Sequence, residues 1–454
     1  MPWGLSFLRA MRRDYLGTLA KVHAQCPDAA RMQVLWRRSV HVFHPDMVRE
    51  LLVEQADKVQ RWERVTTIFA MGTGQEGVLV TEGAQWQRQR RLLQAGFGPK
   101  RVSAYTRHMV YACDSALRAL DTSPHNTPHD TPHDMHALMT RVTMDVIVRA
   151  LFGHARQIDT ARVSHAIHAL STEGYAQVFR PWLLPAWFPW PSVQRARRAK
   201  GWLDQLIAGQ IAHKRAEAQT TPAHAPDNEA GDLLTMLLQA RDPEQPEQGL
   251  SPQEVHDQTM VMFQAGHETS ATALTWWAGL VARHPEVAQR LHHEVDSVLQ
   301  GAMPHADCTQ RMPWLMASLK ESLRLYPAAA ILMTRCSAHD LHCGPWQLAA
   351  GDLITITPAL IQRDARWFPE PDQFKPERFL PGAPETPRGA WMPFGSGPRV
   401  CLGQHFAMME MAIVSAMLLQ RFALEWPQGH AWPEGEVSIT LRPATPMLVR
   451  LTPR

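Results

Sequence analysis

Several features that mark particular classes of protein are scarce in this sequence. The 46 lysine and arginine residues nearly balance the 43 aspartate and glutamate residues, which leaves a formal net charge of +3. Because nucleic-acid-binding domains carry a clear excess of positive charge, the composition gives no reason to expect nucleic acid as a partner. Hydrophobic residues make up 45% of the chain and charged residues 20%. These proportions exclude a disordered or fibrous chain and predict a globular protein.

Long apolar runs are also missing. No stretch reaches the roughly 18 unbroken apolar residues that a membrane-spanning helix needs. The N-terminus, MPWGLSFLRAMRRDYLGTLAK, is interrupted by Arg9, Arg12, Arg13 and Asp14 before the core of a signal peptide could form. We therefore predict no transmembrane anchor and a cytoplasmic protein. The amphipathic start could rest on a membrane surface, but a helix packed against its own domain is the favoured interpretation.

Cysteine is rare, and no two cysteines form a C-x-x-C pair. The six are Cys26, Cys113, Cys308, Cys336, Cys343 and Cys401. This scatter argues against zinc ribbons, iron–sulfur clusters and a disulfide scaffold. Five of the six are interpreted as small buried hydrophobic residues, and Cys401 is the exception.

The periodicity of apolar residues indicates a mainly α fold with a minor β-sheet subdomain. Helical spacing occurs in 44–57, 86–96, 100–120, 135–152, 200–218, 251–284, 286–300, 313–325 and 403–422, and strand-like alternation in 32–43, 353–357 and 437–452. No long linker divides the chain, so we expect one domain over 1–454, with an N-terminal extension over 1–30. The Pro- and His-rich stretch 123–134 and the stretch 219–231 are predicted surface loops; metal binding by the histidines is a less favoured alternative.

The helix expected over 251–284 carries its own start signal and one unusual interior segment. Ser251, Pro252 and Glu254 form the sequence of a capping box. Inside the helix lies AGHETS, where Gly266 costs about 1 kcal/mol relative to alanine. Either a neighbouring helix crosses closely at this point or a ligand approaches the backbone.

The segment FGSGPRVCLG, 394–403, surrounds Cys401 with glycines and places Arg399 nearby. Glycines permit a tight loop whose amides can point at one atom, and amides, an arginine and a following helix would each lower the pKa of a thiol. Three uses remain open on this basis: a nucleophile, a redox thiol, or a single thiolate ligand to haem iron.

The residues then show a specific resemblance. Phe394, Gly397, Arg399, Cys401 and Gly403 match F-x-x-G-x-R-x-C-x-G, and this loop is similar to the haem-binding loop of the cytochrome P-450 family. The same family's other motifs follow in the right order: Phe406, Ala407 and Glu410 after the loop; Trp86 and Arg90 as W-x-x-x-R; Ala265, Gly266, Glu268 and Thr269 as the oxygen-binding groove; Glu321 and Arg324 as E-x-x-R; and PERF at 376–379. The resemblance covers about 30–454.

The resemblance implies a cytochrome P-450 fold, haem b (iron protoporphyrin IX) as cofactor, and Cys401 as its axial ligand. It implies further haem contacts from Phe394, Gly395, Gly403, Ala407, Arg399, Arg90, Trp86 and Arg335, the last four toward the propionates. Thr269 and Glu268 would deliver protons, beside Gly266 and Ala265 in the oxygen groove. Glu321, Arg324 and Arg378 would form a structural ion-pair network.

By the same resemblance, the protein would be a monooxygenase that inserts one atom of O2 into a hydrophobic small molecule. The pocket would be lined by 61–82, 180–191, the helix face around Phe263 and Ala265, and 328–333. Electrons would come from NAD(P)H through a ferredoxin or flavodoxin-type partner, docked near Arg88, Arg91, Lys100 and Arg101. The alternatives are a hydrogen-peroxide-driven peroxygenase of the same fold and a non-catalytic haem sensor or carrier.

Overall fold

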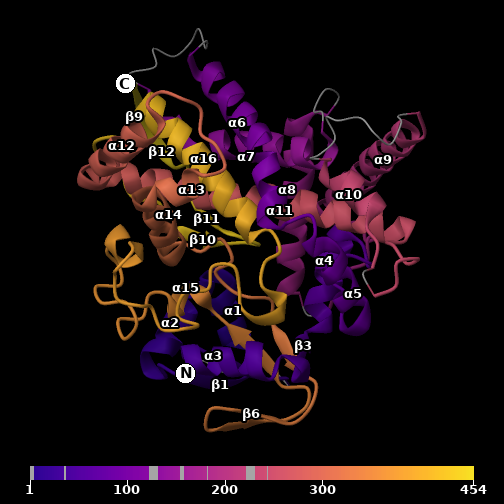
Figure 1. The fold of residues 1–454 in the computed structure, drawn as a ribbon. Coiled ribbons are helices and arrows are strands. Elements are labelled where there is room, and N and C mark those ends of the chain that lie inside the picture. Colours follow the sequence, from indigo (N-terminus) through magenta and orange to yellow (C-terminus); the bar gives the residue numbers. More distant parts are fainter. Residues whose placement is uncertain are drawn as a thin grey trace.

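The computed structural model describes residues 5–34, 37–121, 131–153, 158–180, 182–220, 231–242 and 244–454. Helices dominate the described part (Figure 1). They are α1 (Leu5–Arg13), α2 (Tyr15–Gln25), α3 (Pro45–Arg49), α4 (Glu63–Thr73), α5 (Gly83–Gln94), α6 (Pro99–Asp121), α7 (Met135–Phe152), α8 (Thr160–Val178), α9 (Pro191–Thr220), α10 (Leu233–Gln239), α11 (Pro252–Arg283), α12 (Pro285–Leu299), α13 (Cys308–Arg311), α14 (Pro313–Leu325), α15 (Pro358–Ile361) and α16 (Gln404–Arg421).

The strands form four small sheets. The five-stranded sheet has the order β1 (Ala29–Val34), β2 (Arg37–Val42), β8 (Leu353–Ile356), β5 (Arg335–Ser337), β3 (Val59–Arg61), and its β2–β8 pair is parallel with Ser39 opposite Leu353. The others pair β4 (His133–Asp134) with β12 (Leu448–Pro453) and β9 (Phe422–Glu425), β10 (Gly435–Val437) with β11 (Leu441–Pro443), and β6 (Leu341–Cys343) with β7 (Trp346–Leu348). The mainly α fold with a minor β component is confirmed.

α11 runs through the helical part of the molecule and contributes many residues to its largest hydrophobic core. Ser251 accepts from the Glu254 backbone at 3.0 Å, and the Glu254 carboxylate accepts from the Ser251 backbone at 2.8 Å, so the predicted capping box is present. Trp276 and Trp277 are fully buried, and Trp276 stacks on Tyr326 with ring centroids 3.9 Å apart. The Trp277 Nε1–H donates to the Ser318 hydroxyl at 2.9 Å, so burial of these large rings contributes several kcal/mol and holds α11 against α14 and the Tyr326 that follows it.

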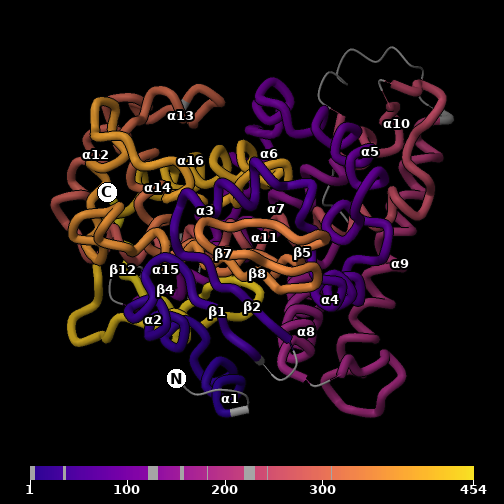
Figure 2. Tube along the Cα trace, turned by 90° about the horizontal axis from the view of Figure 1, so that it is seen from below, coloured from indigo at the N-terminus to yellow at the C-terminus, as the bar shows by residue number. Residues whose placement is uncertain are grey.

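The N-terminal helices pack on the five-stranded sheet. Figure 1 shows α1, α2 and α3 on the lower side of the molecule, below the bundle formed by α6, α7, α11 and α16, and Figure 2 shows that lower side with the sheet in front. Phe7, Met11 and Leu19 are buried in the same hydrophobic cluster as Val40 of β2. The amphipathic start therefore covers the protein's own core, as favoured from the sequence. Among the described residues, no helix combines the length and apolar composition that a bilayer span requires.

Some elements differ from the sequence-based expectations. The stretch 32–43 is not one strand, because β1 and β2 form an antiparallel pair with Arg31 opposite Val40. The stretch 437–452 contributes parts of three strands. Helix α8 was not predicted; Glu173 and Gln177 lie on its buried face and hydrogen-bond to each other at 2.9 Å, which obscures the apolar period. The loops expected at 123–134 and 219–231 lie mostly outside the described residues.

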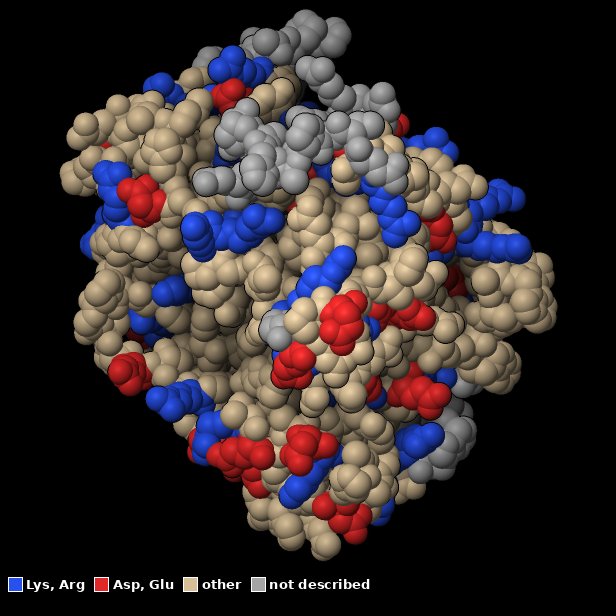
Figure 3. Space-filling view, turned by 45° about the vertical axis from the view of Figure 1, so that its right-hand side comes forward, with Lys and Arg blue, Asp and Glu red and all other residues tan. Residues whose placement is uncertain are grey.

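Charges of both signs are interspersed on the face shown in Figure 3. Cys113 and Cys343 are buried, as expected for structural cysteines, whereas Cys26 and Cys336 are only partly buried.

Glu410 of α16 gives a stability prediction, because it is a carboxyl group with no exposed surface. Burial raises its pKa from 4.5 to about 8, and the nearby Ser270 side chain opposes this rise only in part. Among the described residues, neither carboxylate oxygen of Glu410 has a hydrogen-bond partner. Between these two pH values the folded protein keeps a proton that the unfolded chain has lost. The free energy of unfolding should therefore fall by about 1.4 kcal/mol per pH unit as the pH rises through this window.

Glu410→Gln should remove that pH dependence. We expect the variant to gain stability over the parent as the pH rises from 5 to 8, measured as the difference between their urea midpoints. Glu425→Gln, at a carboxylate 53% exposed, is the control and should show no such trend. A Glu410→Gln difference that stays constant across the range would show that Glu410 is ionised in the fold.

Candidate functional site

A cavity of about 620 Å³ lies among α4, α5, α8, α11 and the loop that precedes α16. Every residue that the sequence assigned to haem contact or to oxygen chemistry lines it: Trp86, Arg90, Ala265, Gly266, Glu268, Thr269, Arg335, Phe394, Gly395, Arg399, Cys401, Gly403 and Ala407. Segments separated by more than 300 residues in the sequence thus meet at one place.

The cysteine loop is shaped by two glycines with left-handed backbone. Gly395 has φ 77° and Gly397 has φ 73°. A Cβ atom on Gly397 would stand 1.8 Å from the carbonyl oxygen of Leu52, so no other residue fits there. The Cys401 N–H donates to the Phe394 carbonyl at 2.9 Å, which closes the loop. This geometry fixes the cysteine at the cavity wall independently of its side chain.

Burial raises the pKa of Cys401, while a backbone hydrogen bond from Gly403 and the positive charge of Arg90 act in the opposite direction. The sequence predicted a lowered pKa with Arg399 as the nearby cation. The structure places Arg90 in that role, and Arg90 also donates to the Val400 carbonyl at 2.7 Å. The net direction differs from the expectation because desolvation by the surrounding protein outweighs both favourable contacts, although Cys401 keeps exposed surface at the cavity wall.

Arg399 lies in a different environment. It forms an ion pair with Glu82, donates to the Thr81 carbonyl at 3.1 Å, and stands 4.0 Å above the ring of Trp86. The cation–π contact explains why Trp86 and Arg399 line the cavity together.

The cavity wall carries more arginine than its carboxylates balance. Arg61, whose side chain is 4% exposed, shares Glu82 with Arg399 through a 2.8 Å ion pair. Arg90 and Arg335 donate to backbone carbonyls at 2.7 Å and 3.3 Å, and neither forms an ion pair with a carboxylate among the described residues. Burial and the nearby charge of Arg61 lower the pKa of Arg335 to about 10.

This arrangement fits haem. Buried charges in proteins are normally paired, so two guanidinium groups without a carboxylate favour an anionic ligand. Haem carries two propionates that arginine binds by charge-assisted hydrogen bonds, and a single cysteine can ligate its iron. The thiol of Cys401 and the guanidinium groups of Arg90 and Arg335 supply these complementary groups around one cavity.

Acid and alcohol side chains of α11 line the same cavity. The Glu268 carboxylate accepts from the Thr440 hydroxyl at 3.0 Å and from the Ser171 hydroxyl at 3.2 Å. The Thr269 hydroxyl donates to the Ala265 carbonyl at 2.9 Å, within the helix. Glu268 is thus held by neighbouring elements, whereas Thr269 needs only a side-chain rotation to donate into the cavity.

Gly266 has a packing role beside its place on the wall. A Cβ atom there would stand 2.8 Å from Cδ1 of Ile147 in α7. The close helix crossing, one of the two explanations offered from the sequence, is therefore present, and a side chain at this position would oblige Ile147 to move.

The predicted ion-pair network lies away from the cavity and is fully formed. Arg324 and Glu321 are both 0% exposed and pair at 2.7 Å, and Arg378 contacts Glu321 at 3.3 Å. The Lys375 backbone N–H donates to Glu321 at 2.9 Å. The network ties α14 to the segment that contains PERF.

The predicted substrate-lining segments are placed with two corrections. Phe263 does not line the cavity; it is buried in the core against Phe152, with ring centroids 5.8 Å apart. In 180–191, Leu184 and Ala186 line the cavity, but the tryptophans point outward. Trp182, Trp187 and Trp190 are 68%, 70% and 49% exposed. The lining residues from 61–82 and 328–333 are Arg61, Ile68, Phe69, Met71, Gly72, Thr73, Val78, Leu79, Ala328, Ala329, Ile331, Leu332 and Met333.

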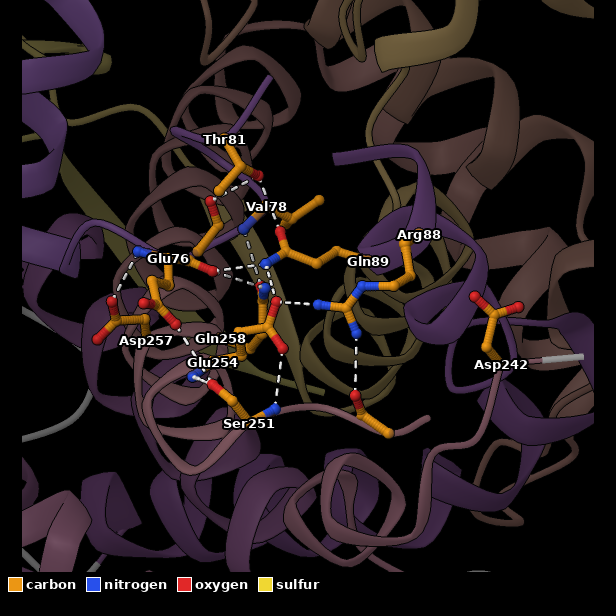
Figure 4. Close-up of polar contacts among 12 residues, drawn as sticks. Glu76, Val78, Thr81, Arg88, Gln89, Asp242, Ser251, Glu254, Asp257 and Gln258 are labelled. Carbon is orange, nitrogen blue, oxygen red and sulfur yellow. Dashed lines mark hydrogen bonds and ion pairs between the residues drawn. The ribbon is translucent and has the colours of Figure 1, made fainter. Parts of the chain in front are cut away.

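Of the four residues expected to dock a redox partner, Arg88 has a different environment from that expected. Arg88 points into the protein, where it pairs with Glu254 and donates to the Gly249 carbonyl at 2.9 Å (Figure 4). Gln89 donates to the same Glu254 carboxylate at 2.8 Å. Arg91 pairs with Asp242 at 3.1 Å. Arg88 thus joins α5 to the start of α11, and Arg91 joins α5 to the segment between α10 and α11, so Arg88 is not a free surface cation.

Sequence reasoning missed four residues at the site. Arg61 and Glu82 lie at the ends of 61–82, but no local pattern distinguishes an inward-pointing ion pair from surface charge. Ser171 belongs to the unpredicted α8, and Thr440 lies between β10 and β11. Each reaches the site through contacts with residues far away in the sequence.

Comparison with known proteins agrees with this geometry. The family model described as cytochrome P-450 matches residues 3–450. Cyclooctatin synthase from Streptomyces melanosporofaciens is 33% identical over 418 residues, 88% of this chain and 84% of the relative. Cyclooctat-9-en-7-ol 5-monooxygenase from the same organism is 30% identical, with 92% and 87% covered. Pentalenene oxygenase from Streptomyces avermitilis is 29% identical, with 84% and 80% covered.

The family match spans nearly the whole chain, and the relatives are named as monooxygenases and oxygenases. The cavity presents one cysteine, an acid–alcohol pair and arginines suited to haem propionates. The protein therefore belongs to the cytochrome P-450 family, the haem-dependent monooxygenases.

Proposed function

We propose that this enzyme inserts one oxygen atom from O2 into a hydrophobic small molecule, with Cys401 as the axial ligand of haem iron. The observation that carries the proposal is that Cys401 and the Glu268–Thr269 pair line the same cavity. When bound, thiolate-ligated haem supplies reductive activation of O2 and cleavage of its O–O bond.

Side chains of the protein bind the propionates, shield the thiolate and transfer protons. Arg90, Arg335 and Arg399, with Trp86, hold the propionates by charge and hydrogen bonding. Phe394, Gly395, Gly403 and Ala407 shape the wall around the thiolate and limit its contact with water. On the part of the cavity wall formed by α11, Glu268 holds and releases a proton, and Thr269 passes this proton into the cavity. Ala265 and Gly266 keep the adjacent backbone free of bulky side chains.

The proposed substrate class follows from the lining. Around the acid–alcohol pair the wall is largely aliphatic and aromatic, with Ile68, Phe69, Val261, Leu332 and Ile439 among its members. Apolar walls with a few polar groups select apolar ligands. Pentalenene, the compound in the name of one relative, is the first candidate. A low-spin to high-spin change in the ferric absorbance spectrum on titration would identify a ligand.

The proposal also includes the electron donor and the cellular location. The family match over residues 3–450 accounts for a haem domain, so we propose a single catalytic domain that receives electrons from NAD(P)H through a ferredoxin or flavodoxin-type donor. A cytoplasmic location follows from the need for intracellular NAD(P)H. We propose that the donor docks near Arg91, Lys100 and Arg101, because Arg88 is engaged with Glu254 and Lys100 is exposed.

Thr269→Ala tests the proposed chemistry. The variant should keep ferric substrate binding and the carbon monoxide spectrum of thiolate-ligated haem. Loss of the hydroxyl should slow proton delivery, so that product per NAD(P)H consumed falls on the order of tenfold while hydrogen peroxide rises. Product and peroxide would be measured in the same reactions.

Thr275→Ala is the matched control. Its hydroxyl makes the same type of bond to the carbonyl four residues earlier, at 2.7 Å, but it lies in the buried core. An unchanged product yield in Thr269→Ala would reject the assignment. Turnover with hydrogen peroxide alone at the NAD(P)H-supported rate would favour a peroxygenase, and the absence of NAD(P)H-dependent product from every bound ligand would favour a haem sensor or carrier.

A further inference from the structure

The segment between α8 and α9 presents three tryptophans to solvent. Trp182, Trp187 and Trp190 are between 49% and 70% exposed. Trp187 and Trp190 both contact the ring of Phe188, with ring centroids 6.2 Å and 5.4 Å apart, so these three rings form one cluster. Large apolar side chains that are exposed together mark a contact surface. We call residues 182–190 the tryptophan segment.

The surroundings of the tryptophan segment are basic. Between Glu173 and Asp204 the chain has no acidic residue and five basic ones: Arg180, Arg195, Arg197, Arg198 and Lys200. The three arginines of α9 are exposed and have no acidic partner in the described part of the chain. The Arg180 guanidinium stands 5.0 Å from the ring centroid of Trp190. Positive charge without a counter-charge therefore lies directly beside the exposed rings.

Helix α1 extends this basic surface. Phe179, at the end of α8, contacts Tyr15 at the start of α2, with ring centroids 6.3 Å apart. Arg9, Arg12 and Arg13 precede Tyr15 in α1, and all three are exposed. Figure 2 shows α1 and the segment that follows α8 along the same edge of the molecule. Because the apolar side of α1 is buried in the protein's own core, α1 adds positive charge to this edge and no further apolar surface.

The inner side of the tryptophan segment belongs to the cavity. Leu184 and Ala186 line the cavity, and Leu184 is only 5% exposed. The same short stretch of chain thus points tryptophans toward solvent and smaller apolar side chains toward the site. An apolar molecule held against the outer side would lie across this one stretch of chain from the cavity.

We propose that the tryptophan segment and the arginines beside it bind the surface of an anionic lipid bilayer, and that the enzyme takes up its apolar substrate from that bilayer. Tryptophan concentrates at the membrane–water interface because its ring is apolar and its N–H group is polar. Basic residues near the surface are attracted by anionic headgroups, which the cytoplasmic leaflet carries. Substrate uptake rests on the proposed function, whereas binding to the bilayer does not.

Charge also argues against a second copy of this chain as the occupant. A two-fold symmetric dimer brings the same patch of each copy together. The arginines of α9 and α1 would then face one another, and like charges repel. An anionic bilayer instead supplies the opposite charge and an apolar interior at one surface.

The first test measures binding of the holoenzyme to vesicles by flotation. The parent should bind vesicles of phosphatidylcholine mixed with phosphatidylglycerol, bind vesicles of phosphatidylcholine alone much less, and lose binding as salt rises. The double variant Trp187→Ser with Trp190→Ser should bind the mixed vesicles on the order of tenfold more weakly, because it lacks the apolar anchor. Arg195→Gln with Arg198→Gln should also weaken binding on the order of tenfold.

Two control variants lie elsewhere on the surface. Tyr111→Ser removes a ring of α6 that is 58% exposed. Arg215→Gln removes an exposed arginine at the other end of α9. Both should bind the mixed vesicles as the parent does. All of these variants should keep the carbon monoxide spectrum of the parent, because none of the replaced residues lines the cavity.

The binding results decide the first part of the proposal. Failure of the parent to bind the mixed vesicles, or equal binding by the parent and the tryptophan double variant, would overturn it. A parent that forms dimers in sedimentation and ignores vesicles, with the dimers lost in the double variant, would assign the tryptophan segment to self-association instead.

The second test measures uptake from the bilayer. The probe is clotrimazole, an apolar imidazole whose nitrogen ligates ferric haem and shifts its absorbance. When clotrimazole is supplied in mixed vesicles, the shift should develop on the order of tenfold faster in the parent than in the tryptophan double variant, in line with their binding. When it is supplied free in solution, the two rates should be equal. Equal rates from vesicles would overturn uptake from the bilayer. Absence of product from O2 would reject the proposed function instead and would leave the vesicle results unaffected.

Discussion

Arg324→Leu is expected to prevent the accumulation of folded, haem-loaded protein. The guanidinium is 0% exposed and donates to Glu321 through both Nε and Nη2, at 2.7 Å and 2.8 Å. It also donates to the carbonyls of Gln362, Pro371 and Gln373, at 2.8 Å, 2.7 Å and 3.1 Å. Leucine would leave these acceptors and the buried Glu321 charge without a partner.

The expected loss of stability is large because the Glu321–Arg324 ion pair is buried. Removal of one partner from a buried ion pair costs about 3–5 kcal/mol, which is a large part of the about 5–15 kcal/mol that stabilises a typical domain. Soluble yield and the ratio of haem absorbance to protein absorbance would report the effect. We expect both to fall to background, or the urea midpoint of any recovered protein to drop accordingly.

Two further variants identify the cause. Arg118→Leu removes an arginine that is 70% exposed and paired within α6, and it should change stability by less than about 1 kcal/mol. The double variant Glu321→Met with Arg324→Leu removes both buried charges and should recover part of the loss. Normal yield and stability in Arg324→Leu would show that this network does not support the fold.

Cys401→Ser is expected to abolish NAD(P)H-dependent product formation while leaving the protein folded. The loop depends on the Cys401 backbone N–H, which donates to the Phe394 carbonyl at 2.9 Å, and on the glycines at 395 and 397. A hydroxyl in place of the thiol keeps these features but cannot act as a thiolate ligand. The carbon monoxide complex of the reduced protein should therefore lose the spectrum of thiolate-ligated haem.

Cys336→Ser is the control, because Cys336 is partly buried in β5 and does not line the cavity. It should keep both the spectrum and the activity. Retention of the thiolate-type carbon monoxide spectrum by Cys401→Ser would remove Cys401 as the ligand, and the proposed function would fail with it.

The parts of this protein that the sequence predicted well depend on local rules. The capping box of α11 and the pairing of Glu321 with Arg324 involve residues three apart. The glycine loop around Cys401 depends on backbone conformations that few other residues adopt. These interactions form wherever the local sequence adopts its intrinsic conformation. The motifs and their order were therefore sufficient to identify the family, which the family match confirms, and to predict the haem site.

Tertiary structure decided what the neighbouring side chains do. Phe263 and Ala265 are two residues apart on α11, yet the first is buried against Phe152 and the second lines the cavity. Arg88 and Arg90 lie on the same helix, but Arg88 pairs with Glu254 and Arg90 acts on Cys401. Helical periodicity predicts the angle around the helix axis between two side chains. It does not predict which residues each side chain contacts.

Glu268 of α11 shows most clearly which features the sequence determines and which depend on tertiary structure. The sequence alone determined that a glutamate precedes Thr269 in a helix and that a lone cysteine follows far downstream. Its partners Ser171 and Thr440, 97 and 172 residues away, were determined by packing of α8 and the β10–β11 turn. Charges and hydroxyls act over a few ångströms in space, and that distance is set only when the chain has folded.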